Sequence, residues 1–214
     1  MHQADNSLYS HSMLQKGRIF KALESLLEHH ELDDITVKQI CSRANIGKTT
    51  FYTHFRDKYE IVQWYTDLGY TEGIAQIGKT LTWRDGHTVS TTFYFMHLDM
   101  LRAAYRSSDY NGIDQYGLRR RIKDLTDTVV NVKHAELTNP LRLMIAGLAA
   151  AEISVFTESM QLEEPITVEE FVDTMIRVVP KDLYDLLKTP VNPDHFLERR
   201  LARMMFIDSA LTSG

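Results

Sequence analysis

The stretch TVKQICSRANIGKTTFYTHF, residues 36–55, decides the fold. It contains two short helical patterns, 36–43 and 48–54, a few residues apart. Apolar side chains recur at helical spacing on the inner face of this unit, namely Val37, Ile40, Cys41, Ile46, Phe51 and Phe55. Asn45 stands in the turn, where a left-handed backbone is usual and Asn tolerates it better than most residues. The pattern predicts a helix-turn-helix, whose second helix enters the DNA major groove.

The outer face of the second helix has the chemistry of a DNA-reading surface. It carries only side chains that can donate hydrogen bonds to phosphates or base edges: Lys48, Thr49, Thr50, Tyr52, Thr53 and His54. None of them is acidic. Short helix pairs also occur in proteins that do not bind DNA, but here an apolar inner face opposes a basic and polar outer face, which favours DNA binding.

The rest of the chain is also helical in pattern, and no alternation of apolar and polar residues persists long enough for a strand. We therefore predict an all-α fold. The expected helices are 10–30, 36–43, 48–54, 58–80, 88–106, 113–134, 140–160, 167–179 and 193–207, with a short one at 181–188. Capping boxes are expected at Thr36 and Thr167, a weaker cap at Asp57, and proline-assisted starts at Asn139-Pro140 and Asn192-Pro193. A break is expected at Asp85-Gly86.

Composition narrows the class of protein. The chain has 214 residues, of which 43% are hydrophobic and 25% charged, so it is long enough to bury a substantial core. Its most apolar segment, 144–156, is short and carries Glu152, so no membrane span is expected, and residues 1–10 are polar, so no secretory signal is expected. The single cysteine, Cys41, excludes an internal disulfide and fits a small buried packing residue. The net charge is −5, but residues 10–58 hold eight basic against six acidic groups, a slightly basic head on an acidic body.

Residues 15–62 resemble the DNA-binding domain of TetR-family transcriptional regulators. The positions that match the family pattern are Thr36, Ile40, Ala44, Ile46, Tyr52, His54, Phe55 and Lys58. The departures are mild: Cys41, Asn45, Gly47, Phe51 and Val62. Gly47 in place of a Ser/Thr cap costs only a few tenths of a kcal/mol. The resemblance implies a DNA-binding domain at 10–58 and a helical domain for dimerisation and effector binding at 59–214.

The resemblance also assigns roles within the head. It implies that Thr36 touches a phosphate, and that Lys48, Thr49, Thr50 and Thr53 face the major groove. Tyr52 and His54 would lie on the backbone or a base. Lys58 would bind phosphate from the start of the following helix, aided by that helix's dipole. Because few bidentate side chains are present, thymine-methyl contacts and DNA shape should matter more than direct readout.

In the family, the remaining chain forms a dimer and a ligand pocket. The helices expected at 140–160 and 167–179 resemble the C-terminal end of the subgroup that includes the dihydroxyacetone-kinase coactivator. The two-fold interface is therefore expected there, at Met144, Gly147, Leu148, Ala151, Val155, Phe171 and Met175. An effector pocket is expected among the preceding helices, lined by Trp64, Tyr65, Phe93, Met96, Met100, Tyr105 and Tyr116. Aromatic and methionine side chains are more often plain core, but as a pocket these would suit an apolar or aromatic effector.

Other features have simpler interpretations. His29 and His30 have no second ligand at helical spacing, so neither a metal nor any other cofactor is expected. The run Arg119, Arg120 and Arg121 is expected to pair with acids on an exposed face. The GxxxG spacing of Gly69 and Gly73 carries little meaning in so polar a helix.

The first hypothesis is a homodimeric repressor of palindromic operators that a small-molecule effector releases, in the bacterial cytoplasm at the nucleoid. The alternative is a coactivator or adaptor that acts through a protein partner. An exposed apolar patch on the last helix, at Phe196, Leu197, Leu201 or Phe206, would favour that alternative. An enzyme would need a carboxylate–histidine cluster or a nucleophile with a base, and the sequence displays neither.

Overall fold

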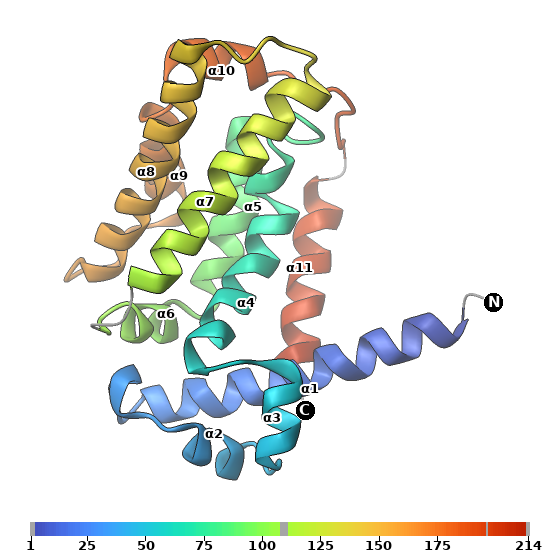
Figure 1. The fold of residues 1–214 in the computed structure, drawn as a ribbon, viewed down its shortest axis with the longest axis vertical. Coiled ribbons are helices and arrows are strands. Elements are labelled where there is room, and N and C mark those ends of the chain that lie inside the picture. Colours follow the sequence, from blue (N-terminus) through green and yellow to red (C-terminus); the bar gives the residue numbers. More distant parts are fainter. Residues whose placement is uncertain (1–2, 108–110, 196, 213–214) are drawn as a thin grey trace.

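The computed structural model describes residues 3–107, 111–195 and 197–212, with side chains over 11–107, 115–195 and 197–209. The fold is all-α, as predicted (Figure 1). Its helices are α1 (Gln3–Leu27), α2 (Val37–Arg43), α3 (Lys48–His54), α4 (Lys58–Glu72), α5 (Trp83–Phe95), α6 (Leu98–Ala104), α7 (Asn111–Asp127), α8 (Asn139–Gln161), α9 (Val168–Arg177), α10 (Lys181–Leu187) and α11 (Leu197–Thr212). Helices α1–α3 form one end of the molecule, and α4 leads from them into the larger bundle of α5–α10 (Figure 1).

Several helix starts follow the local signals in the sequence. Thr36 and Thr167 form complete capping boxes with Gln39 and Glu170. Asp57 accepts a hydrogen bond from the backbone N–H of Glu60. These contacts satisfy N–H groups that have no partner within the helix.

Other boundaries differ from prediction. Helix α4 ends at Glu72, and α5 starts at Trp83 because the Thr82 side chain caps it through the N–H of Asp85. The expected break at residues 85–86 therefore lies inside a helix. His97 divides the stretch 88–106 into α5 and α6. The cap expected at Asn139 is made by Thr138, one residue earlier.

The start expected at Asn192-Pro193 is wrong. Residues 191–194 are not helical, and α11 begins only at Leu197. The backbone N–H groups of Val191, Asn192 and Asp194 donate to the carbonyls of residues 78–80 instead. Hydrogen bonds to a distant loop thus replace a local helix start.

The hydrophobic core continues from the head into the body. One cluster joins α1–α3 to α4, α5 and α6, with Tyr65 stacked between Phe20 and Phe93 at centroid distances of 4.4 and 4.6 Å. Met204 of α11 completes this cluster. A second cluster at the far end gathers Trp83, Leu125, Val129, Leu148, Leu183 and their neighbours. Cys41 is buried in the first cluster, as expected.

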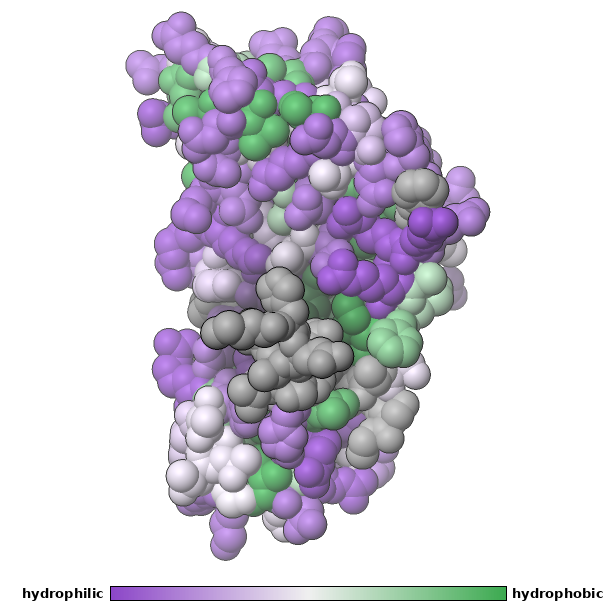
Figure 2. Space-filling model, turned by 90° about the vertical axis from the view of Figure 1, so that its right-hand side faces the viewer, coloured by the Kyte–Doolittle hydropathy of each residue, from purple (hydrophilic) through white to green (hydrophobic). Residues whose placement is uncertain are grey.

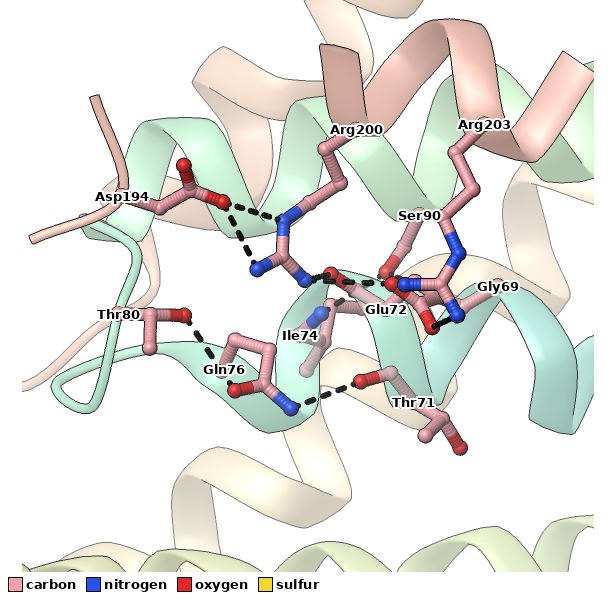
Figure 3. Close-up of polar contacts among 10 residues, drawn as sticks. All are labelled: Gly69, Thr71, Glu72, Ile74, Gln76, Thr80, Ser90, Asp194, Arg200 and Arg203. Atoms are coloured by element: carbon pink, nitrogen blue, oxygen red, sulfur yellow. Dashed lines mark hydrogen bonds and ion pairs between the residues drawn. The ribbon is translucent and has the colours of Figure 1, made fainter. Parts of the chain in front are cut away.

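Gly69 and Gly73 allow α4 and α5 to cross closely. Their GxxxG spacing therefore has a structural role, contrary to the expectation from the sequence. A Cβ on Gly73 would lie 2.3 Å from the Ser90 hydroxyl and 2.5 Å from the backbone oxygen of Gly86. The Ser90 hydroxyl donates to the carbonyl of Gly69 and accepts from the N–H of Ile74 (Figure 3). The small residues therefore permit a polar contact at the end of α4.

Helix α11 connects the head to the body. It packs along α1, α4 and α5 (Figure 1). Its Arg200 donates to the Asp194 carboxylate at 2.9 and 3.0 Å and to the Glu72 carbonyl at 2.8 Å (Figure 3). Near its other end, Asp208 lies 3.0 Å from His97, which also contacts Glu24 of α1. Three elements that are distant in sequence thus meet at one imidazole.

Candidate nucleic-acid interface and ligand cavity

Helices α2 and α3 form a helix-turn-helix with the geometry predicted from residues 36–55. Asn45 has a φ of 52°, and the N–H of Ile46 closes the turn on the carbonyl of Cys41 at 3.0 Å. Phe51 and Phe55 are buried beneath α3. Because this inner face is fully used in packing, the opposite face of α3 is the one left for a ligand.

That outer face is open. Lys48, Thr49, Thr50, Tyr52 and Thr53 are exposed, and 57% of Tyr52 is accessible. The Thr53 hydroxyl donates to the carbonyl of Thr49. His54 is half-buried, and burial, together with the nearby Lys16 and His11, lowers its pKa. All four residues predicted to face the major groove, together with Tyr52, thus present their side chains to solvent on a single helix.

Two predicted phosphate contacts already have partners within the chain. The hydroxyl and the N–H of Thr36 both donate to the Gln39 side chain in the capping box. The Lys58 ammonium donates to the carbonyls of Asp33 and Ile35, at 2.7 and 2.8 Å. Lys58 therefore ties α4 to the loop before α2, and any phosphate contact would be additional to that role.

A cavity of about 100 Å³ lies in the body. Its wall is formed by α4, α5, α7, α8 and α9 together with residues between these helices: Thr66, Asp67, Tyr70, Ile74, His87, Tyr94, Tyr105, Tyr116, Gly117, Arg120, Arg121, Glu152, Ile153, Phe156, Phe171 and Met175. Tyr116 is exposed at one side, whereas His87, Arg121 and Glu152 are buried. The cavity therefore has a polar group at its inner end behind largely aromatic walls.

A buried ion pair forms that polar group. The Arg121 guanidinium donates to both oxygens of Glu152, at 2.5 and 2.8 Å, and His87 Nε2 lies 3.5 Å from the same carboxylate. Burial alone would raise the pKa of Glu152, but Arg121 and His87 lower it to about 2. Burial alone would lower the pKa of Arg121, but Glu152 raises it. Both groups remain charged at neutral pH.

The sequence predicts Arg121 on an exposed face, and this prediction is wrong, because Arg121 is buried against Glu152. The sequence does contain a signal for this ion pair: Glu152 is a single carboxylate within the most apolar segment. A charge that is buried in such a segment needs a partner of opposite charge. Of the predicted pocket residues, Tyr105 and Tyr116 line the cavity. Trp64, Tyr65, Phe93, Met96 and Met100 instead pack in or against the first core cluster. They lie on helix faces that meet α1 and its neighbours, whereas Thr66, Asp67 and Tyr70 of α4 face the cavity.

Residues 19–63 match the model of a known family, "Bacterial regulatory proteins, tetR family". The match spans α2, the turn and α3. These residues thus form a DNA-binding domain of the TetR family of transcriptional regulators. This family consists of DNA-binding regulators rather than enzymes. No curated protein sequence matches the regulator.

The regulator's fold resembles a solved structure, "Dihydroxyacetone kinase operon activator DhaS". The TM-score is 0.53 at 14% sequence identity, over 81% of the regulator and 96% of that chain. At this identity the likeness concerns the fold. It extends well beyond the head, so the arrangement of the body is shared as well.

Helix α8 of the regulator is apolar but poorly covered. By length and composition alone it could cross a membrane, with a mean hydropathy of 1.4 over an 18-residue window, of which 22% is buried. Its exposed face carries Leu143, 73% accessible, followed by Gly147, Ala150 and Ser154. One large apolar side chain and three small ones along a helix face leave room for a second helix to approach closely.

The predicted interface residues divide into two groups. Gly147 is exposed, and Met144, Ala151 and Val155 are half-buried. Leu148, Phe171 and Met175 are buried within the regulator: Leu148 packs in the second core cluster, and Phe171 and Met175 line the cavity. The uncovered face is therefore centred on Leu143 and Gly147 rather than on α9.

Among the described residues there is no cluster of three or more His, Cys, Asp or Glu that could hold a metal.

Proposed function

We propose that the regulator is a homodimeric repressor of palindromic operators, released by a small-molecule effector that enters the cavity. The observation that carries the dimer is the uncovered face of α8, where Leu143 is 73% exposed beside Gly147 and Ala150. Exposed apolar helix faces of this kind mark interaction surfaces. A second copy with the same small residues offers a self-complementary partner.

Dimerisation would give the head its specificity. One recognition helix contacts only a few base pairs, whereas two related by a two-fold axis read half-sites about one helical turn, or a multiple of it, apart. An effector in the cavity would touch α4, which begins at the head and lines the cavity with Thr66, Asp67 and Tyr70. It could release DNA only by binding more tightly to a head spacing that does not fit the operator. Such a repressor would work in the bacterial cytoplasm at the nucleoid.

Two variants on α8 test the dimer. Leu143→Glu places a charge in the proposed interface, and Gly147→Leu adds bulk where nothing lies within 4 Å in the single chain. Both should yield a folded monomer by sedimentation and weaken operator binding. Val191→Glu, another exposed apolar position, should remain dimeric. A monomeric wild type would refute the dimer, and dimeric forms of both α8 variants would refute this interface.

The operator is tested by selecting genomic DNA fragments with the purified protein at low and near-physiological salt. Enrichment of a palindrome at the higher salt would support sequence-specific repression. Tyr52→Ala should then lose operator affinity while staying folded and dimeric. Recovery of DNA only at low salt would indicate electrostatic, non-specific contact and would contradict the proposal.

One observation favours the alternative, an adaptor that acts through a protein partner. On α11, Met205 and Phe206 are 53% and 73% exposed, whereas Leu197 and Leu201 are half-buried against the core. Phe196 lies outside the described residues. Figure 2 shows the side of the molecule that lies to the right in Figure 1, where α11 is found. Hydrophilic side chains predominate on this side, and the hydrophobic ones form separate groups. A Phe206→Ser variant that binds the operator normally but loses regulation in cells would support the adaptor.

A further inference from the structure

The cavity is small and its walls are aromatic. The Phe156 ring makes edge contacts with Tyr94, Tyr105 and Phe171 at centroid distances of 5.4, 5.3 and 6.2 Å. All four rings line the cavity. Its volume of about 100 Å³ is somewhat below that of an engineered cavity of about 150 Å³ that holds benzene in another protein. The cavity is therefore no larger than one aromatic ring needs, and such a ring would fill it after small shifts of the lining side chains.

The charged groups around the cavity are already paired. Arg121 and Glu152 form the bidentate ion pair, and Arg120 pairs with Asp67. The Arg120 guanidinium also lies 4.5 Å from the centroid of the Tyr70 ring. An ionised ligand would have to be buried without a free counter-charge, which is costly. The site therefore favours a neutral compound.

One polar side chain of the wall is buried without a hydrogen bond. His87 is 0% exposed, and neither of its ring nitrogens has a hydrogen-bond partner in the part of the chain that the structure describes. The Glu152 carboxylate lies 3.5 Å from its Nε2, and both carboxylate oxygens accept hydrogen bonds from Arg121 instead. Buried polar groups in folded proteins are nearly always hydrogen-bonded, so His87 is the point where a ligand can be bound by its polar group.

We infer that the cavity takes a neutral, single-ring aromatic compound whose one hydroxyl or carbonyl group hydrogen-bonds to His87. This inference rests on the proposed effector role of the cavity and narrows it to a chemical class. The rings of Tyr94, Tyr105 and Phe156 would surround the aromatic part of the compound, and His87 would set its orientation. Discrimination between compounds of equal size would then come from the polar group.

Four probes of similar size test the inference on the full-length protein by calorimetry: phenol, toluene, benzoate and benzylamine. Phenol should bind at least about tenfold more tightly than toluene, because only phenol supplies a partner for His87. Benzoate and benzylammonium should bind more weakly than phenol. If the two neutral probes bind equally, if either ion binds best, or if no probe binds up to about 5 mM, the inference is wrong.

Two variants test whether the probes occupy this cavity and hydrogen-bond to His87. His87→Leu should remove the preference for phenol over toluene, whereas His29→Leu, at an exposed histidine, should retain it. Gly117→Ala would place a methyl group 3.0 Å from Ile153 Cδ1 at the cavity wall, and should weaken phenol and toluene alike. If His87→Leu retains the preference in a folded protein, the polar contact lies elsewhere and the assignment fails. If His87→Leu does not fold, the Gly117→Ala result decides whether the probes occupy this cavity.

The effect on DNA is measured separately, as operator affinity with and without saturating phenol. Phenol that binds through His87 but leaves operator affinity unchanged would contradict release by an effector in this cavity and leave the ligand class intact. A wild type that binds the operator but none of the probes would contradict the ligand class and leave the DNA-binding function intact.

Discussion

The buried pair of Arg121 and Glu152 allows a quantitative prediction for Glu152→Gln. The pKa of Glu152 falls from an ordinary value of 4.5 to about 2, which corresponds to roughly 3 kcal/mol of stabilisation at neutral pH. Removal of one partner of a buried ion pair gives a similar figure of about 3–5 kcal/mol, because the other charge stays buried without compensation. Glu152→Gln should therefore lower the free energy of unfolding at pH 7 by about 3 kcal/mol.

The assay is urea unfolding at pH 7, at one fixed protein concentration because the proposed dimer would make stability concentration-dependent. The matched control is Asp185→Asn, which removes an exposed carboxylate that pairs with Lys181 and Lys188. That control should show no measurable change. An Arg121→Met/Glu152→Leu double variant should recover much of the loss, since an apolar pair of similar volume leaves no buried charge.

The same pair sets a pH dependence. Because the pKa of Glu152 is depressed on folding, its contribution is complete above pH 4.5 and is lost as the pH falls from 4.5 towards 2. The stability difference between wild type and Glu152→Gln should therefore shrink across that window. A loss below about 1 kcal/mol at pH 7, or a difference that stays constant down to pH 3, would refute the argument.

Three further predictions concern other parts of the molecule. Burial alone would lower the pKa of His97, but hydrogen bonds to Asp208 and Glu24 raise it to about 9. Its contribution, about 1–2 kcal/mol after solvent screening, is therefore complete below pH 6.5 and lost as the pH rises towards 9; thermal unfolding of His97→Gln should lack this alkaline loss. Gly73→Ala should cost about 2–3 kcal/mol in urea unfolding because its Cβ would meet backbone atoms, and a stable variant would show that α4 and α5 can separate freely. Lys48 is exposed and can contact a phosphate as well as a base edge, so Lys48→Ala should reduce the salt slope of DNA binding by about one unit without loss of stability; an unchanged slope would show that Lys48 does not contact a phosphate.

Local signals predicted the head well. The capping box at Thr36, the left-handed Asn45 and the buried pair Phe51 and Phe55 all depend on residues within one or two helical turns of each other. Such contacts are the same whatever the rest of the chain does. The outer face of α3 then follows by elimination, because the inner face is committed to packing.

The body was harder to predict because the same side-chain types serve both core and cavity. Tyr65 and Tyr70 lie on one helix, yet Tyr65 packs against Phe20 and Phe93 while Tyr70 faces the cavity. Periodicity shows that the helix has an apolar face, but it does not show which neighbouring helix covers each part of that face. For the same reason the sequence predicts Phe171 at an interface, whereas its side chain is buried within the chain.

The sequence by itself therefore determined the helical class, the helix-turn-helix and the residues on its outer face, because short-range hydrogen bonds and helical spacing specify them. Only the tertiary structure decided where α11 begins, which aromatic side chains surround the cavity, and that Glu152 pairs with Arg121, 31 positions earlier in the chain. These features depend on contacts between helices that are distant in sequence. Burial by a distant helix, and not the local pattern, determines whether a side chain becomes core, cavity wall or surface.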